Sequence, residues 1–190
     1  ADAAVATAAA LNVTEPTSTG LGGDCFALFY DAKTRAVTAL NGSGRAPAAL
    51  TIDLVQKQNL ASPDHQFSIP FHAHCVTAPG ACAGWCDFIE RHGTLPTSKI
   101  LAPAIALAEE GFPVAPATAH YWQRSEDKLR SVLGGQAKLI KGHAPRAGEI
   151  FRNPGLARTL HTIVEGVKDA YYKGDIARAI VEVVQKSGGV

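Results

Sequence analysis

The sequence lacks any block of like charge. Its 18 lysines and arginines almost balance 17 aspartates and glutamates across 190 residues. Proteins that bind nucleic acid or anionic membranes through charge concentrate basic residues on one segment or one face. We therefore expect no nucleic-acid partner and no membrane partner for this segment.

The sequence also lacks a long hydrophobic run and contains no methionine. Its longest apolar stretch, AAVATAAALNV at residues 3–13, is shorter than the roughly 20 residues that a membrane-spanning helix needs. No basic leader precedes this stretch, as a secretory signal would require. The sequence starts with Ala1, so we expect that an end has been trimmed. We predict a soluble protein, without a signal peptide or a transmembrane segment, and leave its compartment open.

No two of the four cysteines form a CxxC pair. Cys82 and Cys86 are spaced by one helical turn, where Cβ atoms lie roughly 5–6 Å apart. A disulfide requires a Cβ separation of about 3.5–4.5 Å. We therefore predict that Cys25, Cys75, Cys82 and Cys86 are packing thiols, which leaves the redox compartment undetermined.

A metal site is weakly indicated. The stretch HAHC at residues 72–75 places two histidines and a cysteine close together, with His65 nearby. In a strand, His72 and His74 would share one face, as chelation requires. A closed zinc site needs four ligands, however, and no second cluster at a suitable spacing follows. We predict no metal.

The apolar pattern predicts an α+β fold, in which a buried helix and a hairpin precede a mostly helical layer. Small apolar residues over 1–13 predict a helix buried on all sides, and strands are predicted over 25–30 and 35–41. Further helices are predicted over 81–91, 98–110, 117–133, 154–167 and 175–186. Asn153 before Pro154 is a typical helix start, and Gly188 is a typical helix end.

The stretch LNGSGRAP, residues 40–47, follows the second predicted strand. Three interpretations are open: a turn with a solvated charge, a phosphate cradle, or an arginine presented to an anionic substrate. A dinucleotide fingerprint would need a third glycine where Pro47 stands, and a preceding βαβ unit. No serine lies in a GxSxG elbow either, so the residues alone indicate no side-chain triad.

Several motifs together resemble the large subunit of the γ-glutamyltranspeptidases, also called glutathione hydrolases. In chain order they are EPTSTGLGGD, NGSGRAP, APGACAGW, HGTLP, APAIALAEEGF and AYYKGDIA. GGDCF with NGSGRAP is most similar to the glutathione hydrolase-like branch of that family. The resemblance implies an N-terminal nucleophile hydrolase-type αββα sandwich, of which residues 1–190 form part of a single domain.

The same resemblance implies a mechanism in which a precursor cuts itself and exposes an N-terminal threonine on a small subunit. The α-amino group of that threonine, with a reference pKa of about 7.7–8.0, serves as its base near neutral pH. No metal or organic cofactor is expected. The present chain would be a large-subunit fragment that is inactive without its small subunit. The alternatives are a non-catalytic homologue that serves as a binding or assembly module, and an acylase with altered acyl specificity.

The resemblance places substrate recognition at Ser43, Gly44 and Arg45. Family members carry an arginine for the α-carboxylate of the γ-glutamyl group at the position of Ser43, counted from Ala46 and Pro47. Arginine pairs bidentately with a carboxylate, whereas serine cannot. Two residues along an extended chain return a side chain to the same face about 6.6 Å further on. Arg45 is therefore either the carboxylate-binding residue in a shifted position, a structural residue, or the sign of a different acyl group.

Overall fold

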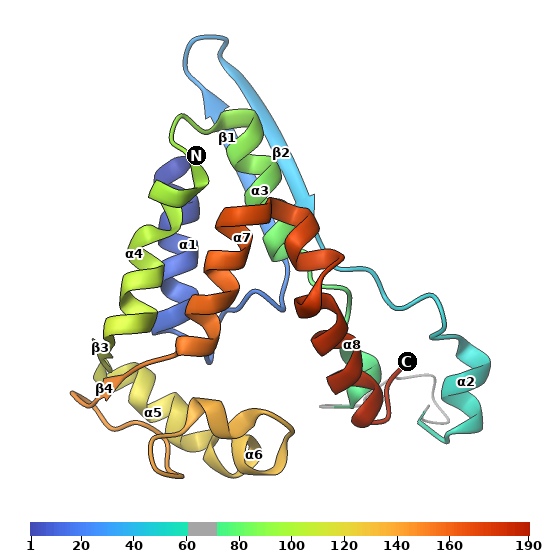
Figure 1. Ribbon diagram of the computed structural model, residues 1–190. Coiled ribbons are helices and arrows are strands. Elements are labelled where there is room, and N and C mark those ends of the chain that lie inside the picture. The colour runs from blue at the N-terminus through green and yellow to red at the C-terminus, as the bar shows by residue number, and fades with distance from the viewer. Residues whose placement is uncertain (61–71) are drawn as a thin grey trace.

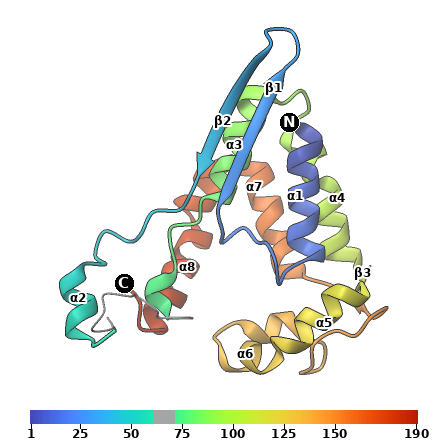
Figure 2. The same cartoon turned by 180° about the vertical axis from the view of Figure 1, so that it is seen from behind.

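The computed structural model describes residues 1–60 and 72–190. A layer of helices carries a long hairpin at one end, and an arm with α2 and α8 projects from it (Figures 1 and 2). The elements, in chain order, are α1 (Asp2–Thr14), β1 (Cys25–Asp31), β2 (Ala36–Gly42), α2 (Ile52–Lys57), a 3-10 turn (Ala73–Cys75), α3 (Ala81–His92), α4 (Thr97–Glu110), β3 (Phe112–Pro113), α5 (Pro116–Arg124), α6 (Glu126–Ser131), a second 3-10 turn (Gly135–Lys138), β4 (Ile150–Phe151), α7 (Pro154–Tyr172) and α8 (Asp175–Lys186).

The core lies where α4 packs against both α1 and α7. Helix α1 contributes Val5, Ala9 and Val13, which recur every four residues and so share one face. Leu160 and Ile163 of α7 are fully buried against the same core. The opposite face of α1 is exposed in the described chain, including Leu11 at 43%. The expectation that this helix is buried on all sides is therefore wrong for the described residues.

Strands β1 and β2 pair antiparallel, from Cys25 opposite Gly42 to Asp31 opposite Ala36. Side chains alternate between the two faces of such a pair. Phe29, on the inner face, packs edge-on to Phe88 of α3 at 6.0 Å between ring centroids. Phe26, Leu28, Tyr30 and Val37 are exposed on the outer face, and Leu28 reaches 78% exposure. We call this outer surface the open hairpin face, defined by those four residues.

Two predicted helices differ from the observed ones. The predicted helix over 117–133 is divided at Ser125, which ends α5 and begins α6. In the first turn of α6, Glu126 accepts a hydrogen bond from the Ala144 amide at 2.7 Å. The helix predicted to end at Val167 is interrupted at that residue, where φ is 53° and ψ is −139°, but further helical turns follow to Tyr172 within α7. The predicted cap at Gly188 is confirmed: Gly189 N–H donates to Val184 O at 2.9 Å and Gly188 N–H to Gln185 O at 3.0 Å, which is a Schellman motif.

Among residues 1–60 and 72–190, no helix combines the length and the apolar character that crossing a membrane requires.

Candidate functional site

Three glycines hold two distant segments together at the end of the hairpin. A Cβ atom on Gly80 would lie 1.9 Å from the carbonyl oxygen of Gly42, and one on Gly44 would lie 2.3 Å from that of Ala78. None of the three glycines has a positive φ. They are needed for close approach of the backbones, not for a left-handed conformation. We call Gly42, Gly44 and Gly80 the glycine junction.

The loop before β1 joins the same junction. The carbonyl oxygen of Gly23 accepts hydrogen bonds from Gly80 N–H and Ala81 N–H, both at 3.0 Å. Asp24 accepts one from the Gly44 N–H at 2.7 Å. The motifs GLGGD, NGSGRAP and APG, which are far apart in the sequence, therefore meet at one place.

The Ser43–Arg45 segment is fixed by its backbone and presents its side chains to solvent. Ser43 N–H donates to the Asn41 side chain at 3.0 Å, and Arg45 O accepts from Ala78 N–H at 2.9 Å. Ser43 and Arg45 are exposed, whereas Gly44 between them is half-buried. This alternation is that of an extended segment with both side chains on one side.

Arg45 has no ion-pair partner among the residues that the structure describes. Its guanidinium thus keeps its five donors available for a planar anion, and a carboxylate fits them bidentately. A phosphate cradle finds less support in the geometry. Such a cradle relies on a helix N-terminus directly after the glycines, whereas the next helix, α2, begins at Ile52 and has six residues.

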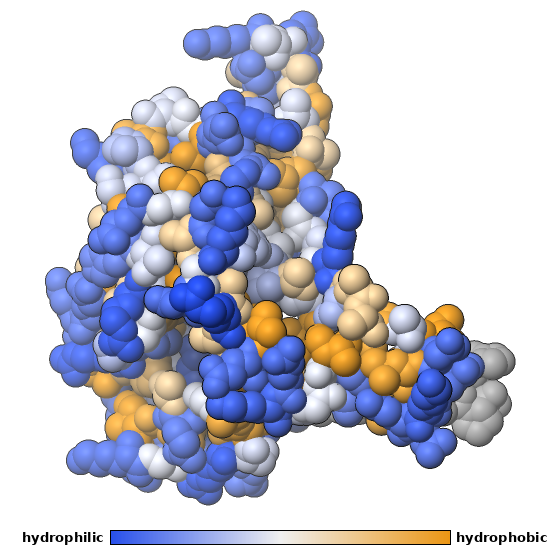
Figure 3. All heavy atoms as spheres, turned by 45° about the vertical axis from the view of Figure 1, so that its right-hand side comes forward, coloured by the Kyte–Doolittle hydropathy of each residue, from blue (hydrophilic) through white to orange (hydrophobic). Residues whose placement is uncertain are grey.

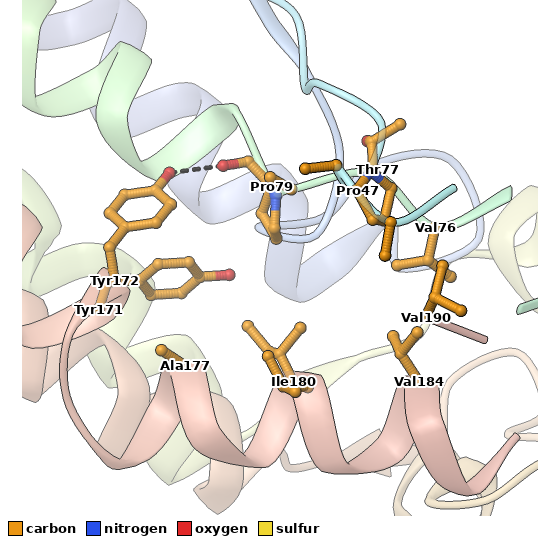
Figure 4. A pocket seen from close by; sticks show the side chains of 14 residues that line it. Pro47, Val76, Thr77, Pro79, Tyr171, Tyr172, Ala177, Ile180, Val184 and Val190 are labelled. Carbon is orange, nitrogen blue, oxygen red and sulfur yellow. Dashed lines mark hydrogen bonds between the residues drawn. The ribbon is translucent and has the colours of Figure 1, made fainter. Parts of the chain in front are cut away.

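An apolar groove adjoins this segment (Figure 4). It encloses about 390 Å³ and is lined by residues 47–49 and 76–79, by Tyr171 and Tyr172, and by Ala177, Ile180, Val181 and Val184 on one face of α8, with Val190 at its end. Figure 3 shows a band of apolar surface along the projecting arm. Sequence reasoning missed the groove, although residues 177, 180, 181 and 184 follow the spacing of a helix face.

The two tyrosines of the groove use their hydroxyl groups in the protein itself. Tyr172 donates to Pro79 O at 2.6 Å and accepts from Ala83 N–H at 3.0 Å. Tyr171 donates to Leu21 O at 3.3 Å. Burial raises the pKa of both tyrosines, so both remain neutral donors.

The HAHC stretch forms a 3-10 turn, not a strand. His72 and His74 stand with ring centroids 4.6 Å apart. His72 Nδ1 accepts from the His74 amide at 3.1 Å, and His74 Nε2 pairs with Gln58 at 2.8 Å. His65 lies outside the described residues. Within the described ranges, no group of three or more His, Cys, Asp or Glu side chains is placed to hold a metal ion.

None of the four cysteines forms a disulfide. Cys25 is half-buried and Cys82 and Cys86 are buried, as expected of packing thiols, whereas Cys75 is exposed, so the prediction is wrong for Cys75. Cys82 and Cys86 are buried on α3. The hydrogen bond with Cys86, together with burial, raises the pKa of the Cys82 thiol. A neutral buried thiol is a poor nucleophile.

One threonine approaches a base. Thr38 Oγ1 lies 3.2 Å from His92 Nε2, and the His92 ring stacks on Phe29 at 4.1 Å. A catalytic triad also needs a third group that orients the base. In the described part of the chain, no carboxylate hydrogen bonds to His92. The pair therefore lacks the arrangement of a nucleophilic centre.

Solved structures show the fold class to which this arrangement belongs. The chain superposes on γ-glutamyltranspeptidase from Helicobacter pylori with a TM-score of 0.88, at 26% identity, over 100% of this chain and 54% of that one. It superposes on cephalosporin acylase from Bacillus halodurans with a TM-score of 0.86, at 40% identity, over 99% of this chain and 35% of that one. The chain has the N-terminal nucleophile hydrolase fold, as the sequence predicts.

The sequence comparison narrows the class to one family. The family described as gamma-glutamyltranspeptidase matches residues 1–190. Two Bacillus subtilis proteins, a glutathione hydrolase proenzyme and the glutathione hydrolase-like YwrD proenzyme, are each 34% identical over 99% and 98% of this chain. The chain belongs to the γ-glutamyltranspeptidase family, whose members are hydrolases and acyltransferases. It spans about a third of the length of these curated relatives, 32% and 35%.

Proposed function

We propose that this chain is the large-subunit part of an amide hydrolase or acyltransferase that acts on glutathione, γ-glutamyl compounds or related acylated amines. Residues 1–190 are part of a single domain, which a small subunit from the same precursor completes. The observation that carries the substrate side of the proposal is Arg45, which is exposed, has no ion-pair partner among residues 1–60 and 72–190, and follows the glycine junction.

The proposed reaction uses a nucleophile that lies outside this chain. The hydroxyl of an N-terminal threonine on the small subunit attacks the amide carbonyl, and its proton passes to the α-amino group. The C–N bond breaks, and the amine leaves with a proton, so an acyl ester remains on the threonine. Water or an acceptor amine then attacks the ester and releases the acyl group as an acid or a new amide. By this reasoning the present chain alone is inactive.

Arg45 binds the α-carboxylate of the acyl group in this proposal. Ser43 and Arg45 are on the same side of an extended segment, so the arginine lies about 6.6 Å from the serine along the chain, a distance that its long side chain spans. Two backbone contacts, Gly44 with Asp24 and Arg45 with Ala78, hold the segment on both sides. A fixed segment reduces the entropy lost when the substrate binds.

The open hairpin face is the surface that we assign to the small subunit. It carries four large apolar or aromatic side chains with no described cover, and a sheet buries such a face against a second layer. The proenzyme relatives support a partner of this kind.

The test is kinetic, on the complete protein with the small subunit. Arg45→Ala is expected to raise the KM for γ-glutamyl p-nitroanilide about 10- to 100-fold at nearly constant kcat, because hydrogen bonds to charged groups contribute about 1.5–3 kcal/mol. Arg124→Ala, which removes another exposed arginine, is the matched control and should leave KM unchanged. An unchanged KM for Arg45→Ala would remove Arg45 from the site. Absence of hydrolysis by the unmodified complete protein would instead favour a non-catalytic binding module.

A further inference from the structure

The apolar groove begins two residues after Arg45, at Pro47. We propose that it binds the hydrocarbon acyl arm of the substrate, so that the substrate class is an acylated amine with an apolar acyl group. This inference rests on the proposed function, since it assigns a specificity to the same site.

Two residues that line the groove also contact the Ser43–Arg45 segment. Thr77 and Ala78 line the groove, and the same two residues contact the glycine junction at Gly44. Ala78 N–H also donates to Arg45 O at 2.9 Å. A substrate whose polar end lies at Arg45 therefore has the groove directly beside it, about 7 Å away along an extended chain.

The chemistry of the lining selects a hydrocarbon. Pro79, Ile180 and Val184 present apolar surface to the cavity in Figure 4. The hydroxyls of Tyr171 and Tyr172 are already used by backbone groups. A polar ligand would lose its hydration here without compensating hydrogen bonds. A volume of about 390 Å³ is within the range of small-molecule sites.

The experiment uses the complete protein and a series of acyl p-nitroanilides with acetyl, butyryl and hexanoyl groups. If the groove holds the acyl arm, kcat/KM should rise with chain length, by about fourfold for each methylene that is fully buried. Ile180→Trp, which fills the groove, should abolish this rise. Val183→Trp is the matched control, because Val183 lies on the same helix, is exposed and does not line the groove. It should retain the rise.

The outcomes separate this inference from the proposed function. Rates that do not depend on chain length overturn the inference while leaving an active amidase. If Ile180→Trp lowers the midpoint of thermal unfolding but leaves the preference for longer acyl chains unchanged, the inference is also overturned, because the groove is then occupied by the protein itself and not by the acyl arm. If γ-glutamyl p-nitroanilide is hydrolysed and no alkanoyl anilide is, the inference is overturned and the proposed function stands. If neither kind of anilide is hydrolysed, the proposed function fails, and calorimetry with hexanamide decides the inference. Binding that Ile180→Trp abolishes and Val183→Trp retains supports the groove, whereas no binding overturns it.

Discussion

A single carboxylate, that of Asp24, holds the segment that carries the proposed substrate residues. It accepts the Gly44 N–H at 2.7 Å, twenty positions further along the chain. We expect Asp24→Ala to raise the KM for γ-glutamyl p-nitroanilide about three- to tenfold, because one hydrogen bond of typical net strength is lost and the segment loosens. Asp24→Asn retains an acceptor oxygen and should restore most of the affinity. Equal KM values for both variants and the unmodified protein would contradict a positioning role.

Asp2 connects the start of α1 to the loop before α4. Its carboxylate accepts from Thr94 Oγ1 at 2.6 Å, Thr94 N–H at 3.0 Å and Leu95 N–H at 3.1 Å. The side-chain hydrogen bond from Thr94 is the main cause that lowers the pKa of Asp2 below its usual 3.8. Because the pKa in the folded protein is the lower one, this contribution to stability is present above about pH 3.8 and lost as the pH falls through the folded value.

Unfolding by urea at several pH values between ~2 and ~5 checks this pH dependence. In Asp2→Asn, the free energy of unfolding should decrease less steeply as the pH falls through that range than it does in the unmodified protein. Asp127→Asn is a suitable control, because that carboxylate is fully exposed at the start of α6 and makes only a long ion pair of 3.7 Å. If Asp2→Asn leaves the pH profile unchanged, the hydrogen bonds to Thr94 and Leu95 do not stabilise the fold.

The junction between the hairpin and α3 tolerates no added side-chain atom. Gly80→Ala adds a Cβ atom that would lie only 1.9 Å from the carbonyl oxygen of Gly42, so the two segments must move apart. We expect a loss of about 1–3 kcal/mol in the free energy of unfolding, as for other overpacked sites. Gly22→Ala is the matched control, because no atom lies within 4 Å of its added Cβ. Equal stability of the two variants in urea unfolding would show that the junction adapts freely.

Most individual elements follow from the sequence. The two strands of the hairpin, the Asn153–Pro154 start of α7 and the glycine end of α8 have local signals, and each is observed. The division at Ser125 was not predicted, although a serine followed by the acidic Glu126 and Asp127 is a typical helix start. The break at Val167 coincides with the predicted end of that helix, whereas the helical turns from there to Tyr172 were not predicted.

The open hairpin face gives a test of how the whole protein is assembled. If the small subunit covers this face, Leu28→Ala in the complete protein should cost about 2–5 kcal/mol in stability, as at a buried site. If the face is exposed there as it is in this chain, at 78% for Leu28, the cost should stay within about 0.5 kcal/mol. Denaturant unfolding measures the difference. Lys33→Ala, at the exposed hairpin turn, is the control and should change stability little.

The candidate site was only partly predictable. The quoted motifs identify Ser43, Gly44 and Arg45 as a segment of interest, because glycines beside a charged residue are visible in the sequence. The partner Asp24, the crossing at Gly80 and the groove under Pro47 are not visible there. They arise from three segments that are far apart in the sequence and meet only in the folded chain.

The sequence by itself determined the fold class, the hairpin, most helices and the family, because these depend on local periodicity, capping residues and motifs read in order along one chain. It left open what Arg45 does. Only the tertiary structure decided that Ser43 and Arg45 are exposed on a segment held by backbone hydrogen bonds and that an apolar groove lies beside it. The physical reason is that close backbone approach at glycines and burial between distant helices are properties of three-dimensional packing, and no neighbouring residue specifies them.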